Sequence, residues 1–136
     1  MTARSRYIFC DIDGTLLQAK GSGRIAFGDA FAEAYGVPVD MSAINFAGAT
    51  DIGVVQQLAR DYGITLESAR NRRFFELLPA YLDENMERMH PVVFPGVESF
   101  LERVSRHWNL GLVTGNIRAC AYLKLKHGNQ VWGVQL

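Results

Sequence analysis

The sequence lacks the features that mark disulfide-rich, membrane-spanning and nucleic-acid-binding proteins. Its two cysteines, Cys10 and Cys120, are far apart and form no C-x-x-C spacing, which argues against a zinc site and a disulfide framework. Its 14 basic residues are balanced by 14 acidic ones, so binding to nucleic acid or an anionic membrane through bulk charge is not expected. No apolar run approaches the roughly 18 residues of a membrane span. The apolar stretch near the start stops at Asp11, too early for a signal peptide. These absences predict a soluble, cytoplasmic protein.

Apolar residues are plentiful, and their spacing predicts an α/β arrangement. They make up 49% of the 136 residues, enough for one domain or one small core with an insertion. A helical pattern without strand signals runs through residues 24–89, after a glycine-rich loop at 20–23. The other expected elements are a buried strand at 6–10, a helix at 97–104, a strand at 110–113, a helix at 117–127 and a strand-like tail at 131–136. Without the helical insertion, the two main strands should be parallel neighbours joined by a right-handed crossover.

Two aspartates end the first predicted strand, in the segment Asp11-Ile12-Asp13-Gly14-Thr15. Residues i and i+2 of an extended chain project to the same side, so Asp11 and Asp13 can face one small volume. Two like charges this close are unfavourable unless a cation neutralises them or one carboxyl holds a proton. The pattern indicates phosphoryl chemistry, with Asp11 as nucleophile and Asp13 as general acid and base. An Asx-turn is the structural alternative, and a calcium loop fits poorly because it requires Gly and Glu where this chain has Leu16 and Ser22.

A second polar cluster follows the strand at 110–113. Thr114 offers a hydroxyl, and Gly115 and Asn116 expose backbone N–H groups at a helix start, which together can bind phosphate. An ordinary N-cap is the alternative for Thr114 or Asn116. Because open α/β sheets bind ligands where the carboxyl ends of their strands meet, the two clusters should converge.

Four further residues are candidates for the site. Lys124 would be useful electrostatically beside two carboxylates and a phosphate, although it could also be a solvated charge on an amphipathic helix. Arg24, Thr50 and Asp51 could reach a substrate from the insertion; a linker arginine and a helix cap are the alternatives. The three histidines share no metal-ligand spacing and are expected at the surface.

These residues resemble the haloacid dehalogenase superfamily of phosphotransferases. Asp11-Ile12-Asp13-Gly14-Thr15 matches its first motif, D-x-D-G-T, and Leu112-Val113-Thr114-Gly115-Asn116 is similar to its second, an apolar strand ending in Thr or Ser. Gly48-Ala49-Thr50-Asp51 resembles the Gly-x-Thr-Asp turn of phosphoglycolate phosphatase-like members. The resemblance covers residues 6 to about 128.

The resemblance implies both architecture and activity. The fold would be α/β, an incomplete Rossmann-like parallel-sheet core in three layers at residues 1–18 and 91–136, with a helical cap inserted at 19–90. The activity would be Mg²⁺-dependent hydrolysis of a small phosphorylated metabolite, with Asp11 as nucleophile and Asp13 as general acid and base. Mg²⁺ would be bound by the Asp11 carboxylate and the Asp13 backbone carbonyl, and Thr114 and Asn116 would hold the transferring phosphoryl group. A sugar-phosphate mutase shares these motifs and is an alternative.

The end of the chain departs from the family pattern. Family members continue to an acidic motif on a strand that pairs with the equivalent of residues 6–10, whereas residues 129–136 contain no acidic residue. We therefore interpret the chain as a C-terminally truncated member. Truncation would leave an unpaired apolar edge at Tyr7–Cys10, which favours self-association. It would also leave Mg²⁺ with few anionic ligands. A non-catalytic protein that binds phosphate or a partner chain is thus a further alternative.

Overall fold

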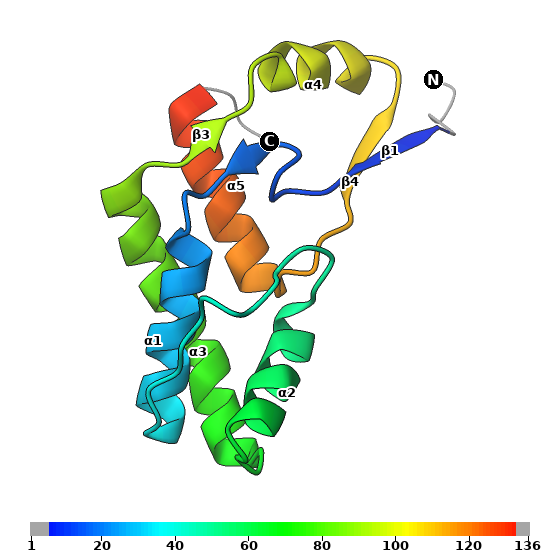
Figure 1. The fold of residues 1–136 in the computed structure, drawn as a ribbon. Helices are drawn as coiled ribbons and strands as arrows, with labels where there is room; N and C mark the ends of the chain where they lie inside the picture. The colour runs from blue at the N-terminus through cyan, green and yellow to red at the C-terminus, as the bar shows by residue number, and fades with distance from the viewer. Residues whose placement is uncertain (1–5, 133–136) are drawn as a thin grey trace.

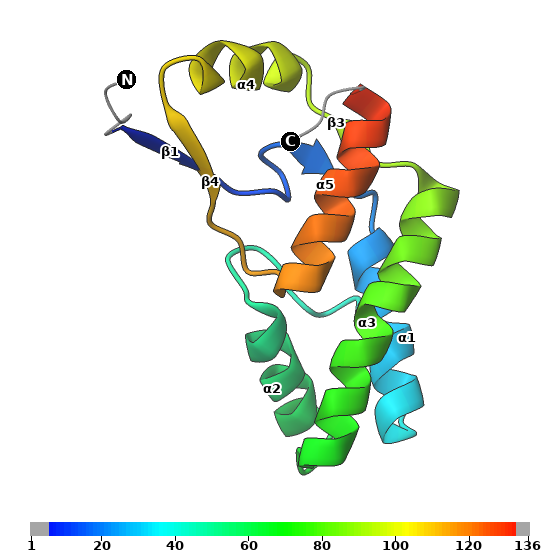
Figure 2. The same ribbon diagram turned by 180° about the vertical axis from the view of Figure 1, so that it is seen from behind.

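A computed structural model describes the backbone of residues 6–132 and the side chains as far as Gly128. The described chain is mixed α/β (Figure 1). Its elements, in order, are β1 (Tyr7–Cys10), β2 (Leu17–Gln18), α1 (Ser22–Tyr35), α2 (Asp51–Asp61), α3 (Ser68–Met89), β3 (Val92–Val93), α4 (Val97–Ser105), β4 (Asn109–Leu112) and α5 (Arg118–Trp132). Helices α1, α2 and α3 cluster at one end, and β1, β4 and α4 lie at the other, with α5 between them (Figures 1 and 2).

Strands β1 and β4 form a parallel pair, which confirms the predicted strand–helix–strand unit. The register places Tyr7 opposite Asn109 and Cys10 opposite Leu112. Phe9 lies over Gly111, where an added Cβ would come within 2.7 Å of the aromatic ring, so a larger residue at 111 would displace this ring. Because both strands end at the same edge, the residues that follow them start from neighbouring positions.

The prediction that the first strand is buried was wrong. Phe9 is 62% exposed, and Tyr7, stacked beside it, is exposed as well. Within the described residues, β1 pairs with β4 alone, so its other edge and one face have no covering element. The apolar run was read correctly as a strand, but burial depends on neighbours that local sequence does not reveal.

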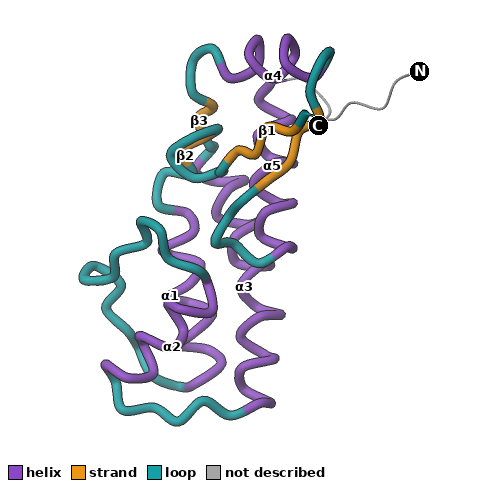
Figure 3. The backbone as a smooth tube through the Cα atoms, turned by 90° about the vertical axis from the view of Figure 1, so that its right-hand side faces the viewer, coloured by secondary structure: helices purple, strands orange, loops and turns teal. Residues whose placement is uncertain are grey.

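A short antiparallel pair joins the two ends of the helical insertion. Leu17 pairs with Val93 and Gln18 with Val92, so the segments entering and leaving the α1–α3 cluster lie side by side (Figure 3). The sequence did not predict this pair, because two-residue strands have too little periodicity to be seen.

Aromatic and aliphatic side chains bury the interior of the α1–α3 cluster. Phe27 and Phe31 of α1 pack their rings against Phe74 of α3, with ring centroids 4.9 and 6.0 Å from it. Gly36 ends α1 in the left-handed conformation (φ 71°). The Thr50 hydroxyl caps α2 by accepting a hydrogen bond from the Gly53 N–H, which is one of the two roles that the sequence left open for it.

Two predicted boundaries were wrong. Helix α1 already begins at Ser22, inside the glycine-rich stretch expected to be a loop. Helix α5 continues through Val131 to Trp132, where a strand-like tail was expected; residues 133–136 lie outside the described residues. Glycine lowers helix propensity, but α1 buries Ser22, Ala26 and Phe27 in its first turns, and this packing outweighs that local preference.

Helix α5 is also tied to the insertion by a histidine that we expected at the surface. His127 is buried, and its Nε2 lies 2.8 Å from Asp83 Oδ1 on α3. None of the described helices is long and apolar enough to cross a bilayer.

Replacing Phe74 with alanine should lower the free energy of unfolding by roughly 3–5 kcal/mol, because Phe74 is fully buried among the rings of α1 and α3. Urea unfolding followed by circular dichroism measures the loss. Ile52→Ala on α2, where the side chain is 57% exposed, is the control and should change stability by less than about 0.5 kcal/mol. Equal losses in the two variants would contradict the described core.

Candidate active site

The two polar clusters meet at the shared edge of β1 and β4. Asn116 donates through Nδ2 to Asp13 Oδ2 at 2.9 Å, although 103 residues separate them in sequence. The same Nδ2 also donates to the Thr114 hydroxyl oxygen at 2.6 Å. The parallel register thus joins the aspartate segment to the Thr114–Asn116 corner, as the sequence led us to expect.

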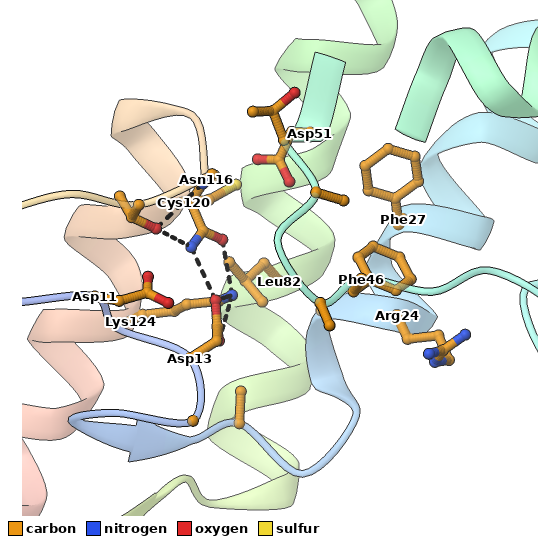
Figure 4. A pocket seen from close by; sticks show the side chains of 18 of the residues that line it. Asp11, Asp13, Arg24, Phe27, Phe46, Asp51, Leu82, Asn116, Cys120 and Lys124 are labelled. Atoms are coloured by element: carbon orange, nitrogen blue, oxygen red, sulfur yellow. Dashed lines mark hydrogen bonds and ion pairs between the residues drawn. The ribbon is translucent and has the colours of Figure 1, made fainter. Parts of the chain in front are cut away.

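Lys124 supplies the cation at this junction. Its ammonium group lies 2.8 Å from each carboxylate oxygen of Asp13 and 2.8 Å from Asn116 Oδ1 (Figure 4). The lysine side chain is only 7% exposed, whereas that of Asp13 is 46% exposed. Of the two interpretations left open for Lys124, a solvated surface charge does not fit this burial. Lys126 and Arg118 on the same helix are exposed.

Asp11 is held differently from Asp13. One of its oxygens accepts a hydrogen bond at 2.8 Å from the N–H of the next residue, Ile12, which is one residue short of the partner that an Asx-turn requires. No cationic side chain of the described residues pairs with its carboxylate. Of the two aspartates, Asp11 therefore keeps an oxygen that is open to a ligand.

Both aspartates open into one cavity of about 1090 Å³. The Thr114–Asn116 corner and Lys124 form one wall, and the insertion forms the other. That second wall includes Phe27 and Phe46, seen opposite the aspartates in Figure 4. A phosphate-sized group at the corner would therefore have further space beside it for an organic portion.

Thr50 and Asp51 sit where the insertion meets the corner. The Asp51 N–H donates to the Gly115 carbonyl at 2.9 Å, and Asp51 Oδ2 accepts from the Ile117 N–H at 2.7 Å. Burial raises the pKa of the Asp51 carboxyl above its ordinary value, although the Ile117 hydrogen bond and the Lys124 charge oppose that shift. Both residues line the cavity. The interpretation of Thr50 as a helix cap is confirmed, and contact with a substrate stays a prediction.

Arg24 also lines the cavity, but its guanidinium is engaged by the insertion itself. It donates to the carbonyl oxygens of Met41 and Ile44 and lies 4.8 Å from the centre of the Phe46 ring. Figure 4 shows it beside Phe46, apart from the two aspartates. Arg24 therefore supports the loop between α1 and α2, and its contact with a substrate likewise stays a prediction.

Comparison with known proteins identifies the family. Residues 7–130 match the family described as haloacid dehalogenase-like hydrolase. The chain belongs to this family. A hydrolase from Pseudomonas syringae has 22% sequence identity and a TM-score of 0.67, over 90% of this chain and 55% of that one. A predicted phosphoglycolate phosphatase from Haemophilus somnus has 19% identity and a TM-score of 0.59, over 98% of this chain and 59% of that one.

These two structures establish likeness of fold alone. The chain spans 55% and 59% of their lengths, and no curated protein matches it. The mixed α/β arrangement with a parallel strand pair agrees with the incomplete α/β core expected of a haloacid dehalogenase-like chain.

The donor set at the aspartates falls short of a strong Mg²⁺ site. Lys124 occupies both oxygens of Asp13, and the described residues contain no group of three His, Cys, Asp or Glu side chains that could hold a metal. What remains is the Asp11 carboxylate and the backbone carbonyl of Asp13. Mg²⁺ is often held by one or two carboxylates, with water and substrate phosphate completing its shell. These residues therefore fit weak binding that a phosphate would strengthen.

Replacing Lys124 with methionine should lower the free energy of unfolding by about 1–2 kcal/mol, because Asp13 and Asn116 lose their shared partner. The loss stays below that of a fully buried ion pair because water reaches Asp13. Lys126→Met, on the exposed face of the same helix, is the matched control. Urea unfolding of both variants measures the effect, and a Lys124→Met variant as stable as Lys126→Met would contradict the described cluster.

The Cys120 thiol should be unreactive in the folded protein, because burial, together with the charge of Asp51 and against the opposing charge of Lys124, raises its pKa to about 12. A Cys10→Ser background leaves Cys120 as the single thiol. Reaction with an aromatic disulfide at neutral pH should be slow when the chain is folded and should accelerate in urea. Equally fast reaction under both conditions would show that Cys120 is accessible.

Proposed function

We propose that this chain hydrolyses a small phosphorylated metabolite through an aspartyl-phosphate on Asp11. The cluster of Asp13, Asn116 and Lys124 is the observation that carries the proposal. It brings the aspartate motif and the Thr-Gly-Asn motif together in one cavity. Asp13 is held by a cation, while Asp11 keeps an open oxygen at the same edge. A nucleophile and a fixed polar partner are the arrangement that covalent phosphoryl transfer requires.

The Thr114–Asn116 corner is suited to hold the phosphoryl group. The Thr114 oxygen accepts hydrogen bonds from both the backbone N–H and the side-chain amide of Asn116, at 3.2 and 2.6 Å. Its own hydroxyl proton is therefore left to donate to a phosphate oxygen. The adjacent Gly115 adds a backbone N–H group, whereas the Asn116 N–H already donates to Thr114 and the Ile117 N–H to Asp51.

In the proposed reaction, an oxygen of Asp11 attacks phosphorus and the bond to the leaving alkoxide breaks. Asp13 must carry a proton at this point; it gives that proton to the leaving oxygen and later takes one from the water that attacks the aspartyl-phosphate. This second step releases inorganic phosphate and restores the Asp11 carboxylate. Lys124 orients Asp13 throughout and adds positive charge near the transferring group. Mg²⁺, when bound, would neutralise charge between Asp11 and the phosphate.

The proposal extends to organisation and substrate. We propose residues 1–18 and 91–136 as the core and 19–90 as the cap, with substrate choice assigned to cap residues that line the cavity. The likeness to a predicted phosphoglycolate phosphatase supports a small phosphorylated compound as substrate. A cytoplasmic location, the absence of nucleic-acid and membrane partners, and self-association through the open edge of β1 stay predictions.

An aryl phosphate assay tests the nucleophile. The chain should release the aryl alcohol faster with Mg²⁺ than with a chelator, and Asp11→Asn should lower the rate by at least about a hundredfold, because an amide is a poor nucleophile. Asp61→Asn, an exposed aspartate on α2, is the control and should keep the full rate. Mass spectrometry of acid-quenched protein should find the phosphoryl group on Asp11.

Two outcomes would contradict the proposal. Turnover that survives Asp11→Asn would remove Asp11 as nucleophile. A folded chain that binds inorganic phosphate but hydrolyses no ester would instead identify a non-catalytic phosphate-binding protein.

A further inference from the structure

Helix α5 receives the polar partner at its N-terminal end from a distant segment. Its first turn contains no acidic residue, and its start lacks the negative group that usually complements a helix dipole. The carboxylate of Asp51, 66 residues earlier in sequence, accepts a hydrogen bond from the Ile117 N–H at 2.7 Å. The insertion therefore supplies the missing negative charge.

Thr50 and Asp51 are adjacent in sequence, but their side chains bind the N-terminal ends of two different helices. Thr50 caps α2, the helix that begins immediately after it, through a 3.0 Å hydrogen bond from the Gly53 N–H. Asp51 is the first residue of α2, yet its side chain does not serve that helix and turns to α5 instead. Since Thr50 already caps α2, the Asp51 carboxylate is free for a contact outside its own helix.

The backbone next to the Asp51 side chain also contacts the Thr114–Asn116 corner. The Asp51 N–H donates to the Gly115 carbonyl at 2.9 Å. A Cβ on Gly115 would lie 2.1 Å from the Ala49 carbonyl oxygen, so any other residue at 115 would push the insertion away. We call the two hydrogen bonds, Asp51 N–H to Gly115 and Ile117 N–H to Asp51, the Asp51 contact. Its two hydrogen bonds bind the residues immediately before and after Asn116.

What the Asp51 contact holds is the catalytic corner itself. Asn116 lies between its two attachment points, Gly115 and Ile117, and it bonds Asp13 and Lys124. Lys124 lies about two turns into α5, so the position of the helix start also sets the position of its ammonium group. A free insertion would leave the Ile117 N–H and the Gly115 carbonyl without these partners.

We propose that Asp51 is a positioning residue: by binding the start of α5 from the insertion, it makes seating of the insertion and ordering of the phosphate corner a single event. This inference rests on the proposed function, in which Thr114, Gly115 and Asn116 hold the phosphoryl group. It assigns Asp51 a role toward the protein's own corner rather than toward a substrate.

Amide hydrogen exchange of the wild-type chain, followed by NMR, is the first test. The two amides of the Asp51 contact, at Asp51 and Ile117, should show protection factors that agree within about tenfold, because both hydrogen bonds break when the insertion lifts. Protection factors that differ by more than this would show independent openings and would overturn the inference.

Variants supply the second test. Asp51→Ala should speed exchange at Ile117 by about tenfold or more and should weaken inorganic phosphate binding, read from the Gly115 and Asn116 amide shifts, by about fivefold or more. Asp51→Asn keeps an acceptor oxygen and should preserve both values within about threefold. Asp40→Ala is the matched control, because Asp40 also accepts a backbone N–H, from Ser42, in the loop before α2. It should leave Ile117 exchange and phosphate binding unchanged.

The outcomes separate this inference from the proposed function. Unchanged exchange and phosphate affinity in Asp51→Ala, or equal changes in Asp40→Ala, would overturn the inference. Loss of both properties in Asp51→Asn would do so too, and this variant and the wild-type comparison decide the matter should Asp51→Ala fail to fold. A wild-type chain that binds no inorganic phosphate would contradict the proposed function, while the exchange data would still support or overturn the Asp51 contact.

Discussion

The parallel register of β1 and β4 sets the geometry from which the polar contacts of the site follow. With Cys10 opposite Leu112, the next residues along each strand emerge at one edge, and Asn116 reaches Asp13 directly. A shift of one residue would turn every side chain of a strand to the other face. In this register the Phe9 ring covers Gly111, and a side chain at 111 would displace it.

The insertion buries more apolar residues than the β1–β4 pair does. The largest group of buried hydrophobic residues belongs mainly to α1, α2, α3 and the loop between the first two helices. The β1–β4 pair has a smaller buried group, centred on Cys10, Leu16 and Leu101, and leaves Phe9 in contact with water. Since buried apolar area is the dominant favourable term in folding, the insertion is the better stabilised part of the described chain. The site therefore lies between the well-packed insertion and the less extensively buried β1–β4 pair.

The sequence predicted site residues that form short motifs, but it did not predict contacts between residues far apart in the chain. The aspartates two apart and the Thr-Gly-Asn corner were recognised because parallel strands share an edge, and the structure does bring Asp13 and Asn116 together. Lys124 was ambiguous, because helical periodicity says which residues share a face but not what that face meets. The signal available was its place two turns after the corner, which puts it on the side of α5 that can face a strand terminus.

Other contacts left no mark in local sequence. The pairing of Leu17 with Val93 joins strands too short to show alternation. The burial of His127 depends on Asp83 of a separate helix, and an isolated histidine carries no signal of such a partner. Asp51 was a plain helix-cap candidate, and nothing near it in sequence indicated that its carboxylate serves α5. In each case the missing information was which distant element packs alongside.

The pairing of His127 with Asp83 has a mechanical consequence when set beside the Asp51 contact. Helix α5 is fastened to α2 at Ile117 and to α3 at His127, ten residues and roughly 15 Å apart along its axis. While both contacts are intact, α5 cannot swing away from the insertion about either one alone. Together they hold α5, and with it Lys124, in one orientation relative to the α1–α3 cluster.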